Sequence, residues 1–140
     1  MSVIYGEADE DGIATVFTRL AGLDGSGSEY KPGEGKAFQQ ADVSSIACKV
    51  FEIASRDAEA GTEITPAPTV TVAGSIFDTL RTVGWDTSKD AHGYNFRHDL
   101  QPAYLADPGE WRCIEYKFTL VTGGIAWLEA RIKTRGKLSS

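Results

Sequence analysis

Two cysteines and two histidines are the side chains best suited to nucleophilic or metal chemistry. Cys48 and Cys113 lie far apart in the sequence, and neither His92 nor His98 has a cysteine nearby. Zinc sites use Cys or His pairs at short spacings that converge on one ion, so this pattern predicts no metal site. Neither cysteine has the setting of a thiol nucleophile. We expect His98 to lie at the edge of the core and to bond to the backbone.

Glycine-rich and acidic segments suggest ligand loops but do not complete them. Residues 33–36, GEGK, imitate a phosphate-binding loop, yet Tyr30 stands where a glycine is needed and Ala37 where Ser or Thr is needed. The acidic segments 9–12 and 24–35 lack the full set of oxygen ligands of a calcium loop. No G-x-S-x-G motif is present. We therefore expect no cofactor, no metal and no catalytic residues.

Length and composition predict one soluble domain. The chain has 140 residues, of which 41% are hydrophobic and 24% charged, which is too apolar for a disordered chain. Its net charge of -6 disfavours binding to nucleic acid. It has no apolar run long enough to span a bilayer, and its first residues do not resemble an export signal.

Alternating apolar and polar residues predict strands along most of the chain. The predicted strands are 14–20, 43–53, 69–73, 94–100, 111–120 and 126–133, while 76–80 fits either a strand or one helical turn. Six or seven short strands without a long helix predict an all-β fold, an antiparallel β-sandwich of immunoglobulin-like or jelly-roll-like type. We expect an N-terminal arm at 1–12 and a single β-sandwich domain at 13–140, which contains a long loop at 22–36.

The alternation also bears on the cysteines. Cys48, Trp85 and Cys113 follow the order of an immunoglobulin core, in which a tryptophan packs on an inter-sheet disulfide. However, Cys113 shares its strand face with Glu115, whereas Ile114 lies on the apolar face. Two independent thiols are therefore favoured over a disulfide.

The outward faces of the last two strands supply the candidate contact residues. Trp111 and Trp127 fall on the polar faces of adjacent strands, where we expect a cross-strand pair that contacts a partner. The acidic segment 7–11 can meet the basic tail within one molecule or between neighbours; this tail consists of Arg131, Lys133, Arg135 and Lys137. The predicted partner-contact residues are Trp111, Trp127, Arg131, Lys133 and Arg135. Alternatively, the tryptophans pack beneath a loop.

Four segments resemble a group of small virion proteins of tailed bacteriophages. They are QQADVSSI at 39–46, IFDTL at 76–80, GYNFRHDL at 93–100 and WRCIEYKF at 111–118, with Trp85 between the second and third. Their order and spacing cover residues 39–118. The chain departs from the pattern mainly at Trp111, where a tyrosine is common in the group.

The resemblance implies a non-enzymatic structural protein of a phage particle with a β-sandwich fold. Its first implied role is that of a capsid cement or decoration protein that stabilises the head, and its second is that of a tail or baseplate component. The implied partners are the major capsid protein or tail proteins, with homo-oligomers in the assembled virion and assembly in the bacterial host cytoplasm. A carbohydrate-binding module, with Trp111 and Trp127 as its platform, is the alternative from another functional class.

Overall fold

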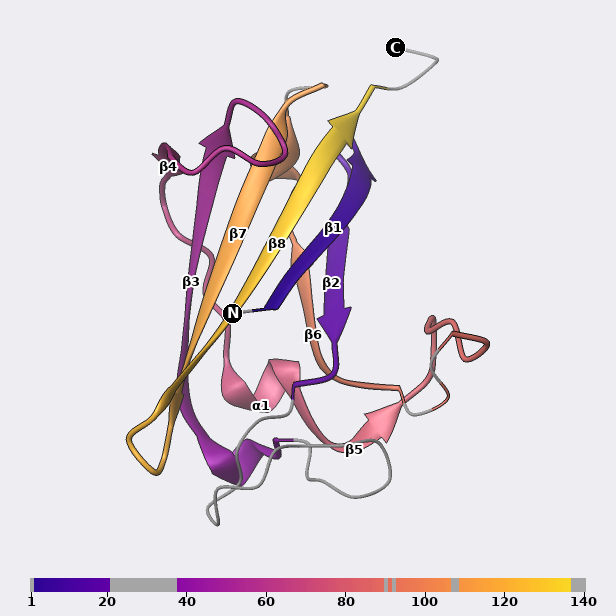
Figure 1. Cartoon of the computed structure of the whole chain (residues 1–140), viewed down its shortest axis with the longest axis vertical. Coiled ribbons are helices and arrows are strands. Elements are labelled where there is room, and N and C mark those ends of the chain that lie inside the picture. Colours follow the sequence, from indigo (N-terminus) through magenta and orange to yellow (C-terminus); the bar gives the residue numbers. More distant parts are fainter. Residues whose placement is uncertain (1, 21–37, 90, 92, 107–108, 137–140) are drawn as a thin grey trace.

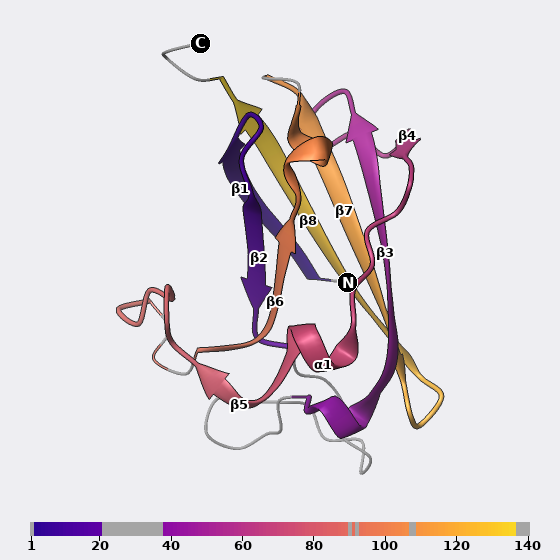
Figure 2. The same cartoon turned by 180° about the vertical axis from the view of Figure 1, so that it is seen from behind.

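The protein is an all-β, sandwich-like fold of two packed sheets, as a computed structural model describes it for residues 2–20, 38–89, 91, 93–106 and 109–136 (Figure 1). The larger sheet has the order β1-β8-β7-β3-β4. Its strands are β1 (Ser2–Asp9), β3 (Val43–Ile53), β4 (Gly61–Ile64), β7 (Trp111–Leu120) and β8 (Ile125–Arg135). The smaller sheet has the order β2-β6-β5, with β2 (Ala14–Thr18), β5 (Ile76–Arg81) and β6 (Tyr94–Leu100). Figure 2 shows the molecule from behind, with β2 and β6 of the smaller sheet in front of the larger sheet.

The core lies between the sheets and follows the predicted alternation. The bounds of β3, β6 and β7 agree with the sequence prediction. The antiparallel register places Ile114 opposite Ala130 and Tyr116 opposite Leu128. These four side chains are almost fully buried, as is Phe96 from the other sheet. Burial of a large apolar side chain contributes about 1.5–3 kcal/mol, so this face provides the main driving force for packing the sheets.

The N-terminal segment differs from the expected arm. Residues 2–9 form β1, which pairs in parallel with β8 from Ser2 opposite Leu128 to Asp9 opposite Arg135. Ile4 and Ala8 pack against the core, so β1 belongs to the sheet. The predicted arm at 1–12 was therefore wrong. Although the segment is acidic, its alternate residues Ile4 and Ala8 are apolar and contact the core, which holds residues 2–9 in the sheet.

Three further elements correct the sequence prediction. The strand predicted at 69–73 is wrong, because α1 (Val72–Ser75) begins within it. The Thr71 hydroxyl accepts a hydrogen bond from the Gly74 N–H at 3.1 Å and caps this short helix. The ambiguous segment 76–80 is strand β5. The short edge strand β4 was not predicted.

Asn95 bonds to Leu20 and Phe38, the described residues on either side of the predicted long loop 22–36. The loop itself lies outside the described residues. The Asn95 side chain is fully buried, although the alternation placed it on a polar face. Its oxygen accepts from the Leu20 N–H at 2.6 Å, and its amide nitrogen donates to the carbonyls of Leu20 at 2.9 Å and Phe38 at 2.7 Å. These bonds satisfy the buried amide.

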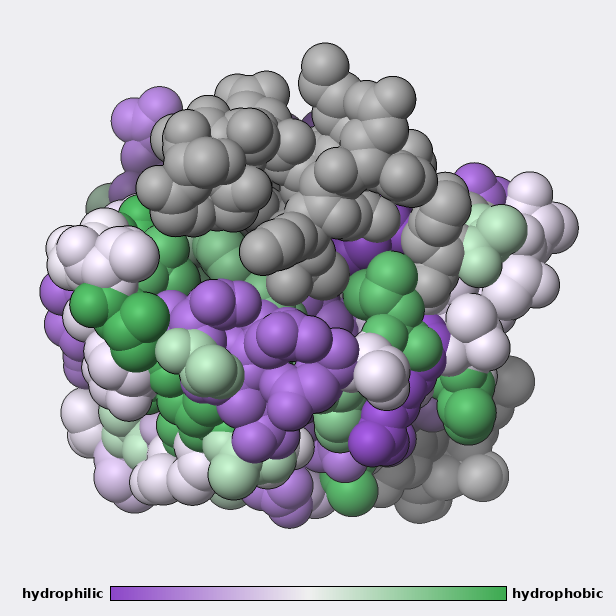
Figure 3. Space-filling model, turned by 90° about the horizontal axis from the view of Figure 1, so that it is seen from below, coloured by the Kyte–Doolittle hydropathy of each residue, from purple (hydrophilic) through white to green (hydrophobic). Residues whose placement is uncertain are grey.

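The lower end of the sandwich in Figure 1 is tied together by polar contacts. The 3-10 helix η1 (Gln40–Asp42) lies beside β5: the Gln40 N–H donates to an Asp78 carboxylate oxygen at 2.8 Å, and the Gln40 side chain donates to the Ile76 carbonyl at 2.9 Å. Seen from below, hydrophilic residues gather near the centre of this end, with hydrophobic residues in separate places around them (Figure 3). Two of the four segments that resemble virion proteins, 39–46 and 76–80, are thus hydrogen-bonded to each other.

Candidate functional site

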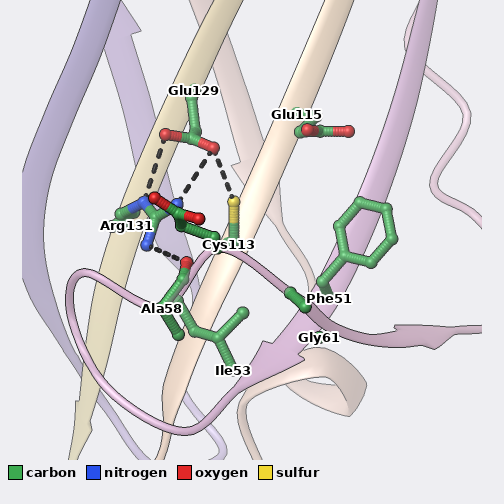
Figure 4. Close-up of a pocket in the computed structure, with 10 residues that line it drawn as sticks. Phe51, Ile53, Ala58, Gly61, Cys113, Glu115, Glu129 and Arg131 are labelled. Atoms are coloured by element: carbon green, nitrogen blue, oxygen red, sulfur yellow. Dashed lines mark hydrogen bonds and ion pairs between the residues drawn. The ribbon is translucent and has the colours of Figure 1, made fainter.

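A cluster of ionisable side chains lies on the outer face of the β7–β8 hairpin, beneath the connection between β3 and β4 (Figure 4). The Cys113 thiol donates to one Glu129 carboxylate oxygen at 3.1 Å, and Arg131 Nε donates to the other at 3.1 Å. Arg131 Nη1 also donates to the carbonyls of Arg56 at 2.6 Å and Ala58 at 2.8 Å. One guanidinium therefore joins the sheet to the connection above it.

Burial and hydrogen bonds set the charges in this cluster. Burial, together with the hydrogen bond to Glu129, raises the pKa of Cys113 to about 12, so its thiol stays protonated at neutral pH. Burial would also raise the pKa of Glu129, but the hydrogen bonds from Arg131 and Cys113 and the positive charge of Arg131 outweigh it and lower that pKa. The cluster thus holds an ion pair and an unreactive thiol.

A hollow of about 280 Å³ adjoins the cluster. Phe51 and Glu115 line it together with Glu129, which is the cross-strand neighbour of Glu115. Among the described residues, no three His, Cys, Asp or Glu side chains are grouped so that they could hold a metal ion. Arg131 bonds both to Glu129 and to the segment between β3 and β4, which explains how that segment is held on the sheet. The Cys113 thiol donates to Glu129 and is therefore not activated as a nucleophile.

His98 forms a second polar contact, which is partly buried and has a partner that differs from the expected one. His98 Nδ1 lies 2.8 Å from the Tyr116 hydroxyl, so its partner is a side chain and the predicted bond to the backbone was wrong. Burial lowers the pKa of His98 more than the nearby Asp99 charge raises it. The neutral imidazole and Tyr116 join Phe96 in a cluster of rings that packs the two sheets. His92 lies outside the described residues.

The predicted tryptophan pair is not formed. Trp111 lies opposite Lys133, whereas Trp127 lies opposite Lys117. Six residues of β7 separate the two positions, roughly 20 Å at the rise of a strand. Trp127 is 43% exposed, and the Lys117 ammonium lies 5.8 Å from the centroid of its ring. The prediction of a cross-strand pair was therefore wrong, because the register of β7 and β8 places the two rings near opposite ends of the hairpin.

Three members of the predicted basic tail, Arg131, Lys133 and Arg135, lie within β8, and the fourth, Lys137, lies outside the described residues. Two of the three on β8 have intramolecular partners. Arg131 serves the cluster described above and is only 13% exposed in its side chain. Arg135 forms an ion pair with Asp9 at 2.9 Å, which confirms that the acidic and basic segments meet within one molecule. Lys133 is exposed. Arg131 is therefore unsuited to the partner contact predicted for it.

An open seam separates the edge strands β1 and β2 of the two sheets. Two hollows of about 230 and 260 Å³ lie along it and share Gly6, Thr15 and Ile132, so they form one groove. One end of the groove is apolar, with Val16 and Phe17 among its lining residues. The other end is lined by side chains that include Glu7, Asp9, Ile13 and Arg135. We call this groove the β1–β2 seam.

No known protein-family model, curated protein or solved structure matches this chain. None of the helices in the described ranges is long and apolar enough to cross a membrane.

Proposed function

We propose that this chain is a non-enzymatic structural component of a tailed-bacteriophage particle, and that it acts as a capsid cement or decoration protein. The β1–β2 seam carries the proposal, because it combines an apolar groove with two sheet edges that the described residues leave uncovered. Exposed strand edges are the usual place where one β-protein joins another chain.

The resemblance to small virion proteins supports the particle assignment, and the structure gives its segments a physical role. Gln40 bonds to β5, Asn95 clamps the chain beside β2, and Tyr116 packs with Phe96 between the sheets. These residues from 39–118 hold the frame of the sandwich. The β1–β2 seam is formed by residues 4–17 and β8, which lie outside that range.

The ionisable clusters give no support to an enzymatic alternative. Cys113 and Glu129 fix the connection above the larger sheet, and His98 bonds to Tyr116 inside the ring cluster. The carbohydrate-binding alternative loses its proposed platform, because Trp111 and Trp127 are not neighbours.

The test is to find the protein in particles. Particles from an induced lysate of the host that carries the gene are purified on a density gradient, and an antibody to this chain is used for quantitative blots and immunogold microscopy. A fixed copy number per particle with label on heads supports the cement role. Label confined to tails transfers the assignment to a tail or baseplate component. Absence of the chain from purified particles overturns the proposal.

A further inference from the structure

Tyr116 and His98 form a hydrogen bond that joins the two sheets. Tyr116 lies on β7 of the larger sheet and His98 on β6 of the smaller one, and the Tyr116 hydroxyl lies 2.8 Å from His98 Nδ1. Tyr116 is fully buried, and among the described residues Nδ1 is the only hydrogen-bond partner of its hydroxyl. A buried hydroxyl that lacks an acceptor is unfavourable, so this one bond bears on the packing of the sheets.

The direction of the hydrogen bond follows from the acceptor that is present. Burial raises the pKa of Tyr116 well above its ordinary value of 10, so the hydroxyl keeps its proton at neutral pH. That proton is donated to His98 Nδ1. In a neutral imidazole one ring nitrogen accepts and the other donates. Nδ1 is therefore the acceptor, and the neutral ring carries its own proton on Nε2.

His98 also borders a hollow of about 290 Å³ beside β6. The hollow is lined by Gly74 and Ser75 of α1, Phe77 of β5, and Arg97, His98 and Asp99 of β6. The imidazole is half-buried, and its two nitrogens point in nearly opposite directions, so Nε2 faces away from Tyr116. The ring thus has a buried side at Tyr116 and an open side at the hollow.

Few charges act on His98 in the part of the chain that the structure describes. Arg97 and Asp99 flank it on β6 and form an ion pair with each other at 3.5 Å. On the larger sheet, the ionisable groups at the contact are Tyr116 and the neutral thiol of Cys48, its cross-strand neighbour on β3. The residues of β2, and those of α1 and β5 at the hollow, are uncharged. Burial of His98 outweighs the Asp99 charge and lowers the pKa of the imidazole.

We propose that His98 and Tyr116 form an acid-sensitive switch between the two sheets, which opens when a proton from solvent occupies the Nδ1 lone pair. That proton removes the acceptor of the Tyr116 hydroxyl, and the described residues provide no second one. The charged ring is stabilised by turning into the hollow, toward solvent and Asp99. The smaller sheet then loses a hydrogen bond to the larger one. This inference goes beyond the proposed function and does not depend on it.

The sign of the pH dependence follows from the two states of the ring. In the unfolded chain the histidine has its ordinary pKa of 6.5, and burial lowers this pKa in the folded protein. The unfolded state therefore binds more protons, so stability falls as the pH drops below 6.5 and levels off below the folded pKa. We expect the equilibrium constant for unfolding to rise at least about fivefold between pH 7.5 and pH 5. The stabilisation by ionised Glu129 is lost only below pH 4.5.

Three variants test the switch by urea unfolding at pH 7.5 and pH 5. His98→Asn places an amide oxygen near the position of Nδ1 but cannot take up the proton, so the rise should disappear. Tyr116→Phe removes the hydroxyl that favours the neutral ring and should reduce the rise to about half or less. Tyr94→Phe is the matched control and should keep the full rise, because the Tyr94 hydroxyl bonds to the Val83 carbonyl, which does not titrate. No rise in the wild type, or a full rise in His98→Asn or Tyr116→Phe, would overturn the inference.

NMR of the isotope-labelled full chain tests the ring and the place of opening. The sequence has two histidines, so a His92→Gln variant assigns the ring signals of His98. At pH 7.5 we expect the ring proton on Nε2, and a proton on Nδ1 would overturn the switch. Amide hydrogen exchange, corrected for the intrinsic effect of pH and compared with His98→Asn, should lose protection at pH 5 more in β2 and β6 than in β3 and β7. Equal loss in both sheets would overturn an opening between them.

Discussion

Arg131 and Glu129 lie two residues apart on the same face of β8, with Arg131 Nε 3.1 Å from a carboxylate oxygen of Glu129. Both side chains are nearly buried, at 13% and 11% exposure. Arg131 Nη1 donates to the carbonyls of Arg56 and Ala58, while Nη2 donates to the other carboxylate oxygen of Glu129 at 3.4 Å. This pair is the point at which the outer face of the sheet holds the connection between β3 and β4.

Replacing Arg131 should destabilise the fold. Arg131→Ala removes the bonds to Arg56 and Ala58 and leaves the Glu129 carboxylate buried beside Cys113, so we expect a loss of about 2–4 kcal/mol in the free energy of unfolding. Urea unfolding followed by circular dichroism measures this loss. The control is Arg135→Ala, which breaks the exposed ion pair with Asp9 and should change stability little. Equal effects of the two variants would contradict the assigned role of Arg131.

The Glu129 ion pair predicts a pH dependence with a definite sign. The pKa of Glu129 is lower in the folded protein than its ordinary value of 4.5. Its ionised form is therefore favoured by folding, and the stabilisation is complete above pH 4.5 and is lost as the pH falls through the folded pKa. The variant Glu129→Gln lacks this titration. The difference in unfolding free energy, wild type minus variant, should shrink as the pH falls below 4.5; a constant or growing difference would refute the prediction.

Both cysteines should be unreactive in the native protein. Cys48 faces the core, Cys113 faces the opposite side of the same sheet, and both are free. Burial raises the pKa of each thiol to about 12, so almost no thiolate exists at pH 8. Ellman's reagent should react slowly with native protein and rapidly with two thiols in urea. Rapid reaction of either thiol without denaturant would contradict this placement. Reaction of fewer than two thiols in urea would contradict it as well.

Asn95 should be intolerant of small changes. Asn95→Asp keeps the acceptor for the Leu20 N–H but loses the donors to the carbonyls of Leu20 and Phe38. A carboxylate buried beside two carbonyls is unfavourable, and we expect at least about 2 kcal/mol of destabilisation at pH 7. Thermal unfolding measures it. The control is Arg97→Ala, a substitution at an exposed position of the same strand, β6. A similar melting temperature for the two variants would argue against the role of Asn95 in holding Leu20 and Phe38.

Much of the sandwich was predictable because its central strands alternate strictly. In β7, Ile114, Tyr116 and Phe118 occupy every second position, and the same parity correctly placed Cys113 on the other face. The pattern failed where polar residues are buried for their hydrogen bonds. Asn95 has the position of an exposed residue, and only its backbone partners, distant in the sequence, explain its burial.

The candidate site was harder to predict, since it depends on register and on sheet edges. Counting cross-strand pairs outward from the hairpin turn between β7 and β8 places Cys113 opposite Arg131. The sequence therefore contained the signal for this contact. Trp111 and Trp127 share a parity but differ in position along the hairpin, which alternation cannot distinguish. Gly6 interrupts an otherwise strand-like segment, and this interruption was the one local signal of the β1–β2 seam.

The most direct measurement is an electron cryomicroscopy reconstruction of purified particles at a resolution that separates strands. The account predicts repeated copies of this sandwich on the head, each in contact with a neighbouring protein at the β1–β2 seam. Particles without density for the sandwich would contradict the proposed function, and sandwiches whose β1–β2 seam faces solvent would contradict assembly through the seam.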